Sequence, residues 1–586
     1  MSEMLNITIN GQAIQVAKGS TILEAAHQAN VTIPTLCYMK DINEIGACRM
    51  CIVEANEGRG FRCVAACVYP CTEGMEIRTN SPKVLDSRKK TLELILSNHD
   101  RKCLSCVRSN NCELQKLAKD LGVEDASRYD GERIEYPIDT TAAHMYRDNN
   151  KCVLCRRCVA VCEKTQGIGV IGANDRGIST HIGSAFEKGL GTTACVSCGQ
   201  CIAVCPTGAL SEKDFTKEVF AAIADPTKKV IVNTAPSVRA ALGEAFGMPI
   251  GTNVEGKMIA ALRRLGFDCV FDTNFSADLT IVEEATELIE RVTNQGVLPM
   301  ITSCSPGWIK FCEHYYPDLI PHLSSCKSPQ QMFGAVTKTY FAEKMGWDPK
   351  DIVCVSIMPC TAKKFESGRE HQSASGYPDI DYALTTRELA RMIERAGLQF
   401  TALPDEKADD PLGIFTGAGL IFGATGGVME AALRYAVEEI TGDKLGAEAI
   451  DFKEVRGTEG IKEATYKVGD LEVKVAVVSG LANARIVMDK IRNGEADYTF
   501  VEVMACPGGC VNGGGQPIQP GSVRNFNDLR ALRAKALYDQ DAAMELRKSQ
   551  DNPAIQALYS EYLGKPGSHK AHEILHTSYV ARKVNF

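Results

Sequence analysis

The cysteine pattern constrains this chain more than any other feature of its sequence. The chain has 586 residues and 25 cysteines, and 17 of these cysteines lie within the first 205 residues. Many of them are separated by only two residues, a spacing that indicates metal ligation in an intracellular protein. The N-terminus has no basic segment followed by an apolar one, so we expect no secretory signal and no secreted disulfide scaffold. The sequence therefore predicts several metal centres in the amino-terminal third.

Composition narrows the class of protein further. The net charge is −8, which argues against nucleic acid as a partner. No run of about 18 apolar residues is present, so we expect no membrane span and a cytoplasmic location. At about 100–200 residues per domain, the length predicts several domains. We expect a multidomain protein with α+β and α/β parts.

Residues 1–80 are predicted to form a β-grasp, plant-type [2Fe–2S] domain. Asn10-Gly11 between two alternating segments predicts a hairpin, and Thr21 with Glu24 predicts a helix start. Cys37, Cys48 and Cys51 have the spacing of a [2Fe–2S] site, for which zinc is the alternative. The segment 66–70 resembles the closing motif of the [2Fe–2S] domain in complex I-type and hydrogenase-type proteins. This resemblance favours Cys67 as the fourth ligand over Cys63.

Residues 81–138 carry a histidine shortly before three cysteines. His99, Cys103, Cys106 and Cys112 have the spacing His-x3-Cys-x2-Cys-x5-Cys. Imidazole can replace a thiolate at an iron–sulfur cluster. Because the three cysteines otherwise lack a fourth partner, we expect a [4Fe–4S] cluster with His99 as a ligand. A zinc site with three cysteines and one histidine is the alternative.

Residues 139–215 contain an internal repeat of the bacterial two-cluster ferredoxin motif. In that motif the fourth cysteine of each run ligates the other cluster. One [4Fe–4S] cluster is therefore expected on Cys152, Cys155, Cys158 and Cys205, and a second on Cys195, Cys198, Cys201 and Cys162.

Residues 225–520 are the predicted catalytic domain. Short apolar strands alternate with helical patterns, such as 276–292, which argues for an α/β architecture. Ligands in such folds gather beyond the carboxyl ends of the strands. Four cysteines stand at strand-to-loop junctions beside proline or glycine, and we expect them to bind a further [4Fe–4S] cluster: Cys304, Cys360, Cys506 and Cys510.

Three motifs in this domain resemble the signature motifs of the [FeFe] hydrogenases. They are 304–308 (Cys-Ser-Pro-Gly-Trp), 358–363 (Met-Pro-Cys-Thr-Ala-Lys) and 502–513 (Glu-x-Met-x-Cys-x-x-Gly-Cys-x-x-Gly). The resemblance runs through the whole chain and is strongest to catalytic subunits of cytoplasmic, NADP-reducing multisubunit enzymes of the electron-bifurcating type.

The resemblance implies an active site and its residues. The site is an H-cluster, in which a [4Fe–4S] cubane is bridged by a cysteine, here Cys510, to a di-iron centre with CO, cyanide and azadithiolate. Lys363 would contact a cyanide. The pocket around the di-iron centre would be lined by Pro236, Ser237, Gln330, Met358, Gly423 and Met504.

One position departs from the family pattern. The family usually has two adjacent cysteines before the proline, a proton relay followed by a cubane ligand, whereas this chain has Cys304-Ser305. Our preferred interpretation keeps Cys304 as the ligand and gives the relay to Ser305. The alternative is a Cys304 relay with Ser305 as an alkoxide ligand.

A proton must leave the pocket when H2 is split heterolytically. Glu284 and Glu287 are three residues apart on one predicted helix and therefore share a face. With Ser324 they match the relay of the family, whereas solvated helix carboxylates are the ordinary alternative.

Residues 521–586 contain no cysteine and are predicted to be a small helical capping or docking segment. His569, His572 and His576 suggest metal, but helix packing is the preferred interpretation.

The leading functional hypothesis is reversible H2 oxidation, with electrons relayed through the N-terminal clusters. An electron-transfer subunit like that of complex I would lack the four cysteines of the catalytic domain, and a non-catalytic H2 sensor is the third possibility. No Gly-x-Gly-x-x-Gly motif follows a strand and opens a helix, so we expect NAD(P) to bind elsewhere. The expected partners are a flavin-containing NAD(P)-binding subunit and a small [2Fe–2S] subunit, or ferredoxin.

Overall fold

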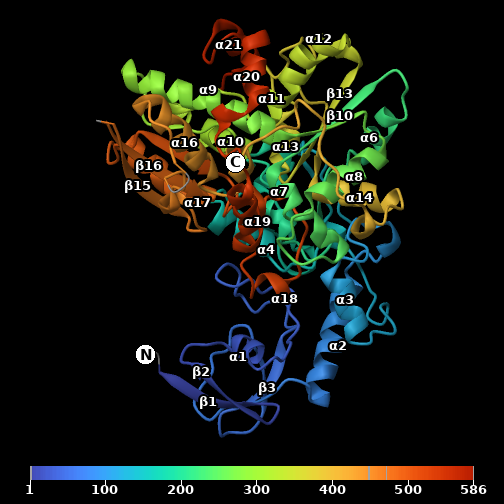
Figure 1. Cartoon of the computed structure of the whole chain (residues 1–586). Coiled ribbons are helices and arrows are strands. Elements are labelled where there is room, and N and C mark those ends of the chain that lie inside the picture. Colours follow the sequence, from blue (N-terminus) through green and yellow to red (C-terminus); the bar gives the residue numbers. More distant parts are fainter. Residues whose placement is uncertain (1–2, 447–448, 470, 585–586) are drawn as a thin grey trace.

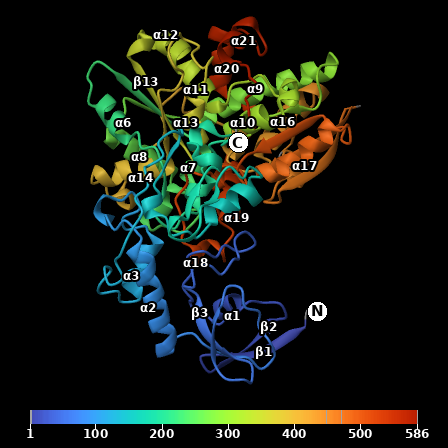
Figure 2. The same cartoon turned by 180° about the vertical axis from the view of Figure 1, so that it is seen from behind.

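Residues 3–446, 449–469 and 471–584 are described by a computed structural model (Figure 1). The segment from β1 to α3 extends from one end of a larger α/β body. Two opposite views agree that β1–β3 lie at the far end from α12, α20 and α21 (Figures 1 and 2).

The N-terminal unit is a five-stranded sheet of order β2-β1-β5-β3-β4. Asn10 and Gly11 both have positive φ, as the predicted hairpin turn requires, and Thr21 and Glu24 form the predicted capping box of α1. Both expectations are confirmed. The elements are β1 (Met4–Ile9), β2 (Gln12–Ala17), α1 (Ile22–Gln28), β3 (Ile52–Asn56), β4 (Arg62–Ala65) and β5 (Glu76–Arg78).

Two helices and a small ferredoxin-like unit join this sheet to the body. Helix α2 (Pro82–Ser97) begins at the Ser81 cap, and α3 (Glu113–Asp120) follows the third predicted cluster cysteine of this region. The ferredoxin-like unit contains β6 (Met145–Arg147) paired with β9 (Leu210–Glu212), β7 (Gly172–Asn174) paired with β8 (His181–Gly183), and the short helices α4 (Arg157–Ala160) and α5 (Gln200–Ala203).

The α/β body contains two four-stranded sheets. The first has the order β11-β10-β13-β14, and all its strand pairs are parallel. The second has the order β12-β17-β16-β15, and only β15 is antiparallel to its neighbour. The strands are β10 (Lys229–Thr234), β11 (Cys269–Asp272), β12 (Met300–Ile301), β13 (Ile352–Met358), β14 (Tyr382–Thr385), β15 (Ile461–Val468), β16 (Leu471–Ser479) and β17 (Phe500–Met504).

Helices surround the two sheets and form the core with them. The longest is α9, whose range nearly coincides with the predicted 276–292 helix. It packs on α11 and α16. The main helices are α6 (Thr216–Ile223), α8 (Glu255–Leu265), α9 (Thr273–Thr293), α10 (Pro306–Tyr315), α11 (Pro329–Val336), α12 (Ala342–Met345), α13 (Ala362–Glu366), α14 (Thr386–Arg395), α15 (Gly417–Ile421), α16 (Gly427–Thr441) and α17 (Leu481–Arg492).

Strand β12 is shorter than the apolar run 297–301 suggests. The apolar run contains Pro299, which has no N–H to donate to a ladder. Pairing with β17 therefore starts at the next residue, Met300.

The C-terminal segment folds back over the body instead of standing apart. It contains α18 (Gly521–Arg524), α19 (Leu529–Ala543), α20 (Pro553–Leu558) and α21 (His569–Leu575). The segment is helical as predicted, and its longest helix begins at Leu529, where Asp528 provides the cap. Phe526 stacks on His27, so this segment also contacts the N-terminal unit. Among the described residues, no helix has the length and apolarity needed to cross a bilayer.

A buried ion network ties α19 to α16. Arg434 donates to Asp541 at 2.9 Å and to Glu430 at 2.7 Å, and all three side chains are essentially inaccessible to solvent. Breaking a buried pair leaves an uncompensated charge, which costs about 3–5 kcal/mol.

We therefore expect Arg434→Leu to lower the unfolding midpoint of the body in denaturant by an amount equivalent to about 3 kcal/mol. Both tryptophans of the chain, Trp308 and Trp347, lie in this body, so tryptophan fluorescence reports its unfolding. The exposed pair Lys90–Asp86 provides the control, because Lys90→Ala should leave the midpoint unchanged. Equal midpoints for wild type and Arg434→Leu would contradict a structural role for the network.

Candidate functional site

Four thiols meet at one point in the N-terminal unit. The Cys37 sulfur contacts those of Cys48 and Cys67, and Cys51 also contacts Cys67. Cys63 lies on β4 and is exposed. The fold thus places Cys67, and not Cys63, with the other three predicted ligands. Four neighbouring thiols, most of them buried, suit an iron–sulfur cluster.

His99 is buried at the end of α2, near the loop of Cys103, Cys106 and Cys112. Burial lowers the pKa of His99 to about 4, so the imidazole is neutral, as a metal ligand must be. Its Nδ1 atom is buried and has no hydrogen-bond partner among the described residues. A buried nitrogen without a partner fits the predicted role as a ligand.

The eight ferredoxin-type cysteines line two separate small cavities. One cavity, of about 20 Å³, is lined by Cys152, Cys155, Cys158 and Cys205. The other, of about 30 Å³, is lined by Cys162, Cys195, Cys198 and Cys201. The fold therefore groups the cysteines in the interlaced sets predicted from the motif, and each set suits one cubane.

Backbone contacts connect the predicted cluster sites. The side-chain amide of Asn43 donates both to the Cys37 carbonyl at 2.7 Å and to the Cys155 carbonyl at 3.0 Å. Arg108 donates to the Cys205 carbonyl at 3.0 Å, and the Cys112 sulfur lies 3.7 Å from the Pro206 carbonyl. Both N-terminal sites thus contact the same ferredoxin-type site.

The second ferredoxin-type site abuts the α/β body. The Thr361 hydroxyl donates to the Ser197 carbonyl at 2.8 Å. A Cβ atom at Gly514 would lie 2.3 Å from the Cys198 carbonyl, so only glycine allows this approach. Cys198 is also close enough to Cys360 and Cys506 for their charges to affect one another.

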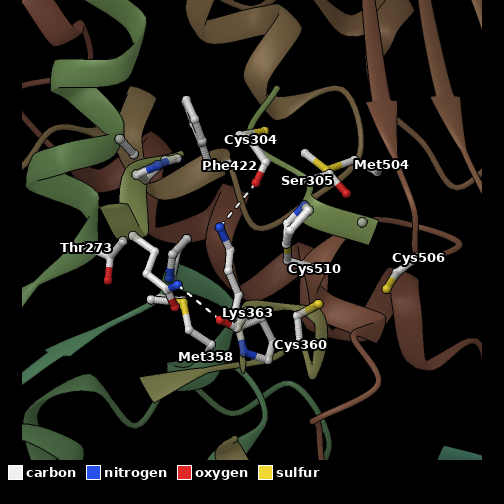
Figure 3. Close-up of a pocket in the computed structure, with 18 of the residues that line it drawn as sticks. Thr273, Cys304, Ser305, Met358, Cys360, Lys363, Phe422, Met504, Cys506 and Cys510 are labelled. Atoms are coloured by element: carbon white, nitrogen blue, oxygen red, sulfur yellow. Dashed lines mark hydrogen bonds between the residues drawn. The ribbon is translucent and has the colours of Figure 1, made fainter. Parts of the chain in front are cut away.

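Two strands of each sheet lead to one cavity of about 70 Å³ in the body, and Figure 3 shows the residues that line it. Strands β10, β12, β13 and β17 lead respectively to Pro236, Cys304, Cys360 and Cys506. The cavity is lined mainly by apolar groups and by thiols. The donor set, with Cys510 beside the other thiols, fits a cluster held at the carboxyl edge of the sheets.

Five of the expected pocket residues line this cavity, namely Pro236, Gln330, Met358, Lys363 and Met504. Ser237 and Gly423 do not belong to the lining that the structure describes; they pack against each other behind it. A Cβ atom at Gly423 would lie 3.3 Å from that of Ser237 and 2.4 Å from Leu537. The glycine at 423 thus allows its backbone to approach Ser237 closely.

Lys363 places a cation inside the cavity wall. Its ammonium group donates to Ser328 and to Glu366, both at 2.8 Å, and to the Cys304 carbonyl at 3.3 Å (Figure 3). Glu366 also accepts from Gln330 at 3.0 Å. The lysine is thus oriented by a buried carboxylate while remaining available to an anionic ligand.

The side chains of Cys304 and Ser305 have different neighbours. The Ser305 hydroxyl accepts from the amide of Ala505, next to Cys506, at 3.2 Å. Cys304 is buried, and burial raises the pKa of its thiol; of the charged groups, the Glu284 carboxyl raises it most. In Figure 3 its sulfur lies apart from those of Cys360 and Cys506. This arrangement favours the alternative interpretation over our preferred one, because consecutive side chains leave the loop in different directions.

A row of polar side chains extends from Cys304 towards the surface. Glu284 lies beside Ser324, whose hydroxyl donates to Glu287 at 3.1 Å. Glu287 accepts from Arg291 at 2.6 Å, and Arg291 is partly exposed. The structure thus brings the three predicted relay residues together and adds Arg291. The i,i+4 spacing of Glu287 and Arg291 was the available sequence signal for this addition.

Glu284 is poised to hold a proton. Burial, together with the Glu287 charge, raises the pKa of its carboxyl to about 8, although hydrogen bonds from Ser324 and the Ser303 amide oppose the rise. Both carboxyl oxygens lack a regular hydrogen bond within the described residues. A carboxyl with a pKa near neutrality can both accept and release a proton at working pH.

Sequence reasoning missed two contributions to this region. Phe422 and Thr273 also line the cavity, but neither residue type carries a chemical signal. His576 was expected to serve helix packing; instead its ring bonds Ser325 at 2.8 Å and Glu283 at 3.2 Å, beside the relay.

Fold and site together define an oxidoreductase that carries iron–sulfur clusters. Family models match almost the whole chain: a 2Fe-2S iron–sulfur cluster binding domain (2–82), the NADH-ubiquinone oxidoreductase-G iron–sulfur binding region (88–127), the ferredoxin-like domain of NADH-quinone oxidoreductase subunit 3 (143–211), the C-terminal domain of the iron-only hydrogenase large subunit (228–514) and the iron hydrogenase small subunit (527–582).

Relatives share this organisation over their full lengths. The chain is 49% identical to an NADP-reducing hydrogenase subunit of Solidesulfovibrio fructosivorans, covering 99% of both chains. It is 45% identical to iron hydrogenase 1 of Clostridium pasteurianum, covering 98% of this chain and all of the other. An [FeFe]-hydrogenase structure from Chlamydomonas reinhardtii aligns with 64% of this chain and 100% of its own, at 43% identity and a TM-score of 0.56. The chain belongs to the [FeFe] hydrogenases, which are oxidoreductases acting on H2.

The raised pKa of Glu284 predicts a pH-dependent stability. Between pH 4.5 and about 8 the folded state holds a proton on this carboxyl that the unfolded state has lost, so stability falls as pH rises. Glu284→Gln removes this group. We therefore expect the variant to gain stability relative to wild type by roughly 3–5 kcal/mol between pH 5 and pH 9. Denaturant unfolding at both pH values measures the difference, and parallel pH profiles for the two proteins would refute it.

Proposed function

We propose that the chain catalyses the reversible oxidation of H2 to protons and electrons at an H-cluster in the 70 Å³ cavity. The observation that carries this proposal is the position of the cavity. On one side it meets a buried carboxyl relay, and on the other it meets a ferredoxin-type cluster site. When bound, the cubane and di-iron centre with CO, cyanide and azadithiolate ligands would supply the heterolytic cleavage of H2.

The chain's own residues hold and shape this centre. Cys360, Cys506 and Cys510 are proposed cubane ligands, with Cys510 as the bridge to the di-iron centre. The Lys363 ammonium group, held by Glu366, would pair with an anionic cyanide. Apolar side chains, including Met358 and Met504, exclude water from the reacting atoms.

We propose that protons leave through Cys304, Glu284, Ser324 and Glu287, and reach solvent at Arg291. Each group in this order lies beside the next, and the path ends at a partly exposed side chain. The raised pKa of Glu284 suits a group that must take up and release protons.

Electrons are proposed to follow the chain of cluster sites, and this path is forked. The Cys198 site abuts the cubane cysteines, and its partner site contacts both the [2Fe–2S] site through Asn43 and the His99 site through Pro206. Two separate entry points could therefore deliver electrons to one ferredoxin-type cluster. The expected inventory is three [4Fe–4S] clusters, one [2Fe–2S] cluster and the H-cluster, or about 20 iron atoms in all.

The proposed partners are a flavin-containing NAD(P)-binding subunit and a small [2Fe–2S] subunit, or ferredoxin, in the cytoplasm. Support comes from the relative named as an NADP-reducing hydrogenase subunit. The branched series of proposed cluster sites offers surfaces for more than one electron carrier.

The test is H2 production by the fully matured protein from reduced methyl viologen under anaerobic conditions, with iron content measured on the same sample. We expect turnover together with about 20 iron atoms per chain. Glu284→Gln is the matched variant, because glutamine keeps the size but cannot pass a proton; turnover should fall at least about 100-fold with unchanged cluster spectra. Inactive protein with full iron content would favour the sensor hypothesis.

We further propose that Ser305 occupies the fourth cubane position and that Cys304 is the relay thiol. The Ala505 amide that donates to Ser305 would stabilise negative charge on a ligand oxygen. Cys304→Ala should then keep the electron paramagnetic resonance spectrum of the cubane but lose turnover. Ser305→Ala should lose the cubane signal, and Ser305→Cys should retain it with a changed reduction potential. Loss of the cubane in Cys304→Ala would instead support Cys304 as the cubane ligand and Ser305 as the relay residue.

A further inference from the structure

Three side chains with metal-binding atoms gather at the outer part of the proposed relay. One ligand atom each from Glu287, Cys326 and His576 lies within 4.8 Å of the other two. The Cys326 sulfur is 3.7 Å from a Glu287 oxygen. Carboxylate, thiolate and imidazole are all common ligands of Zn²⁺, at about 2.0–2.3 Å, so small side-chain adjustments would bring the three to one ion.

The fold holds these residues together through the backbone. Cys326 and His576 face each other across an isolated antiparallel bridge, in which Lys327 donates to the Leu575 carbonyl and Thr577 donates to the Ser325 carbonyl, both at 2.8 Å. The cluster therefore depends on the return of the C-terminal segment to the body and is not an accident of flexible surface side chains.

His576 already has the environment of a metal-bound histidine. Its Nε2 atom pairs with Glu283 at 3.2 Å, and Glu283 is fixed by Tyr559 and by the Gly567 amide. Metal-ligating histidines almost always bond a carboxylate or carbonyl through the nitrogen that does not face the metal. The other nitrogen, Nδ1, faces Ser325 on the side of Glu287, where it could exchange this hydrogen bond for a metal bond.

The local charge also favours a cation. Cys326 is surrounded by Glu283, Glu284 and Glu287, whose charges together with burial raise the pKa of its thiol. Arg291, on Glu287, is the cation that pairs directly with this group of carboxyls in the described structure. Glu287 and His576 retain 13% and 6% side-chain exposure, so an ion can approach from their side.

We propose that Glu287, Cys326 and His576 form an inhibitory site for a divalent cation of the zinc class. Binding releases the Cys326 proton to solvent and leaves a thiolate–metal bond, an imidazole–metal bond and a carboxylate–metal bond. The ion then withholds Glu287 from proton transfer. This inhibitory effect rests on the proposed relay, whereas the binding itself does not.

The experiment adds Zn²⁺ to fully matured, chelator-washed protein and records zinc K-edge X-ray absorption and H2 turnover. We expect one zinc per chain with one sulfur and the remaining ligands nitrogen or oxygen, and at least tenfold inhibition that a chelator reverses. Cys326→Ala and His576→Gln should each require at least about tenfold more zinc, and Cys326→Ala should lose the sulfur ligand. Cys312→Ala removes another buried thiol, 3.4 Å from a backbone carbonyl elsewhere, and should behave as wild type.

Zinc spectra without sulfur, or with sulfur that persists in Cys326→Ala, would overturn the site. Zinc bound through sulfur with full turnover would overturn its inhibitory role and count against Glu287 as a relay member. Absence of turnover before zinc is added would defeat the proposed function alone, because the absorption measurement still decides whether the site binds zinc.

Discussion

The convergence of parallel strand ends on one apolar cavity is the constraint on which the rest of the structure depends. Strands β10 and β13 of the first sheet and β12 and β17 of the second lead to the same cavity, so their loops place thiols that are distant in sequence around a single space. Because the cavity is lined mainly by apolar groups, charges and protons inside it must be stabilised by fixed polar groups. Lys363 with Glu366 and the carboxyl of Glu284 are such groups.

The same constraint explains the glycines and the contacts at the boundary of the α/β body. The proposed function requires an electron to cross between the ferredoxin-type unit and the cavity, so the two must be in contact. Gly514 permits the backbone of Cys198 to approach, and Thr361 fixes it by a hydrogen bond. Glu502, from the third signature motif, instead accepts from the amides of Gly426 and Met429 at the start of α16, which is a structural role. A signature motif thus combines ligands with residues that hold the adjacent helix.

The C-terminal segment contributes more than a cover. Arg434 and Asp541 join it to α16, Phe526 joins it to the N-terminal unit, and His576 reaches the proposed proton relay. Its removal would therefore disturb stability, inter-unit contacts and the surroundings of Glu287 together. The proposed cation site is a consequence of this arrangement, since one of its three ligands comes from the segment.

The sequence by itself determined the sets of proposed cluster ligands wherever these residues are close in the chain. Fixed spacings of two or three residues fit only a few geometries, which is why the interlaced ferredoxin sets and the Asn10-Gly11 hairpin were predictable. The sequence also indicated the α/β architecture and five residues of the cavity lining. Only the tertiary structure decided the cases that depend on side-chain direction or on distant segments. Spacing does not tell which of the adjacent residues Cys304 and Ser305 faces Ala505, because that depends on how the loop leaves β12. Residue spacing also does not show that Arg291 ends the proposed relay or that His576 lies beside Cys326, because long-range packing brings these groups together.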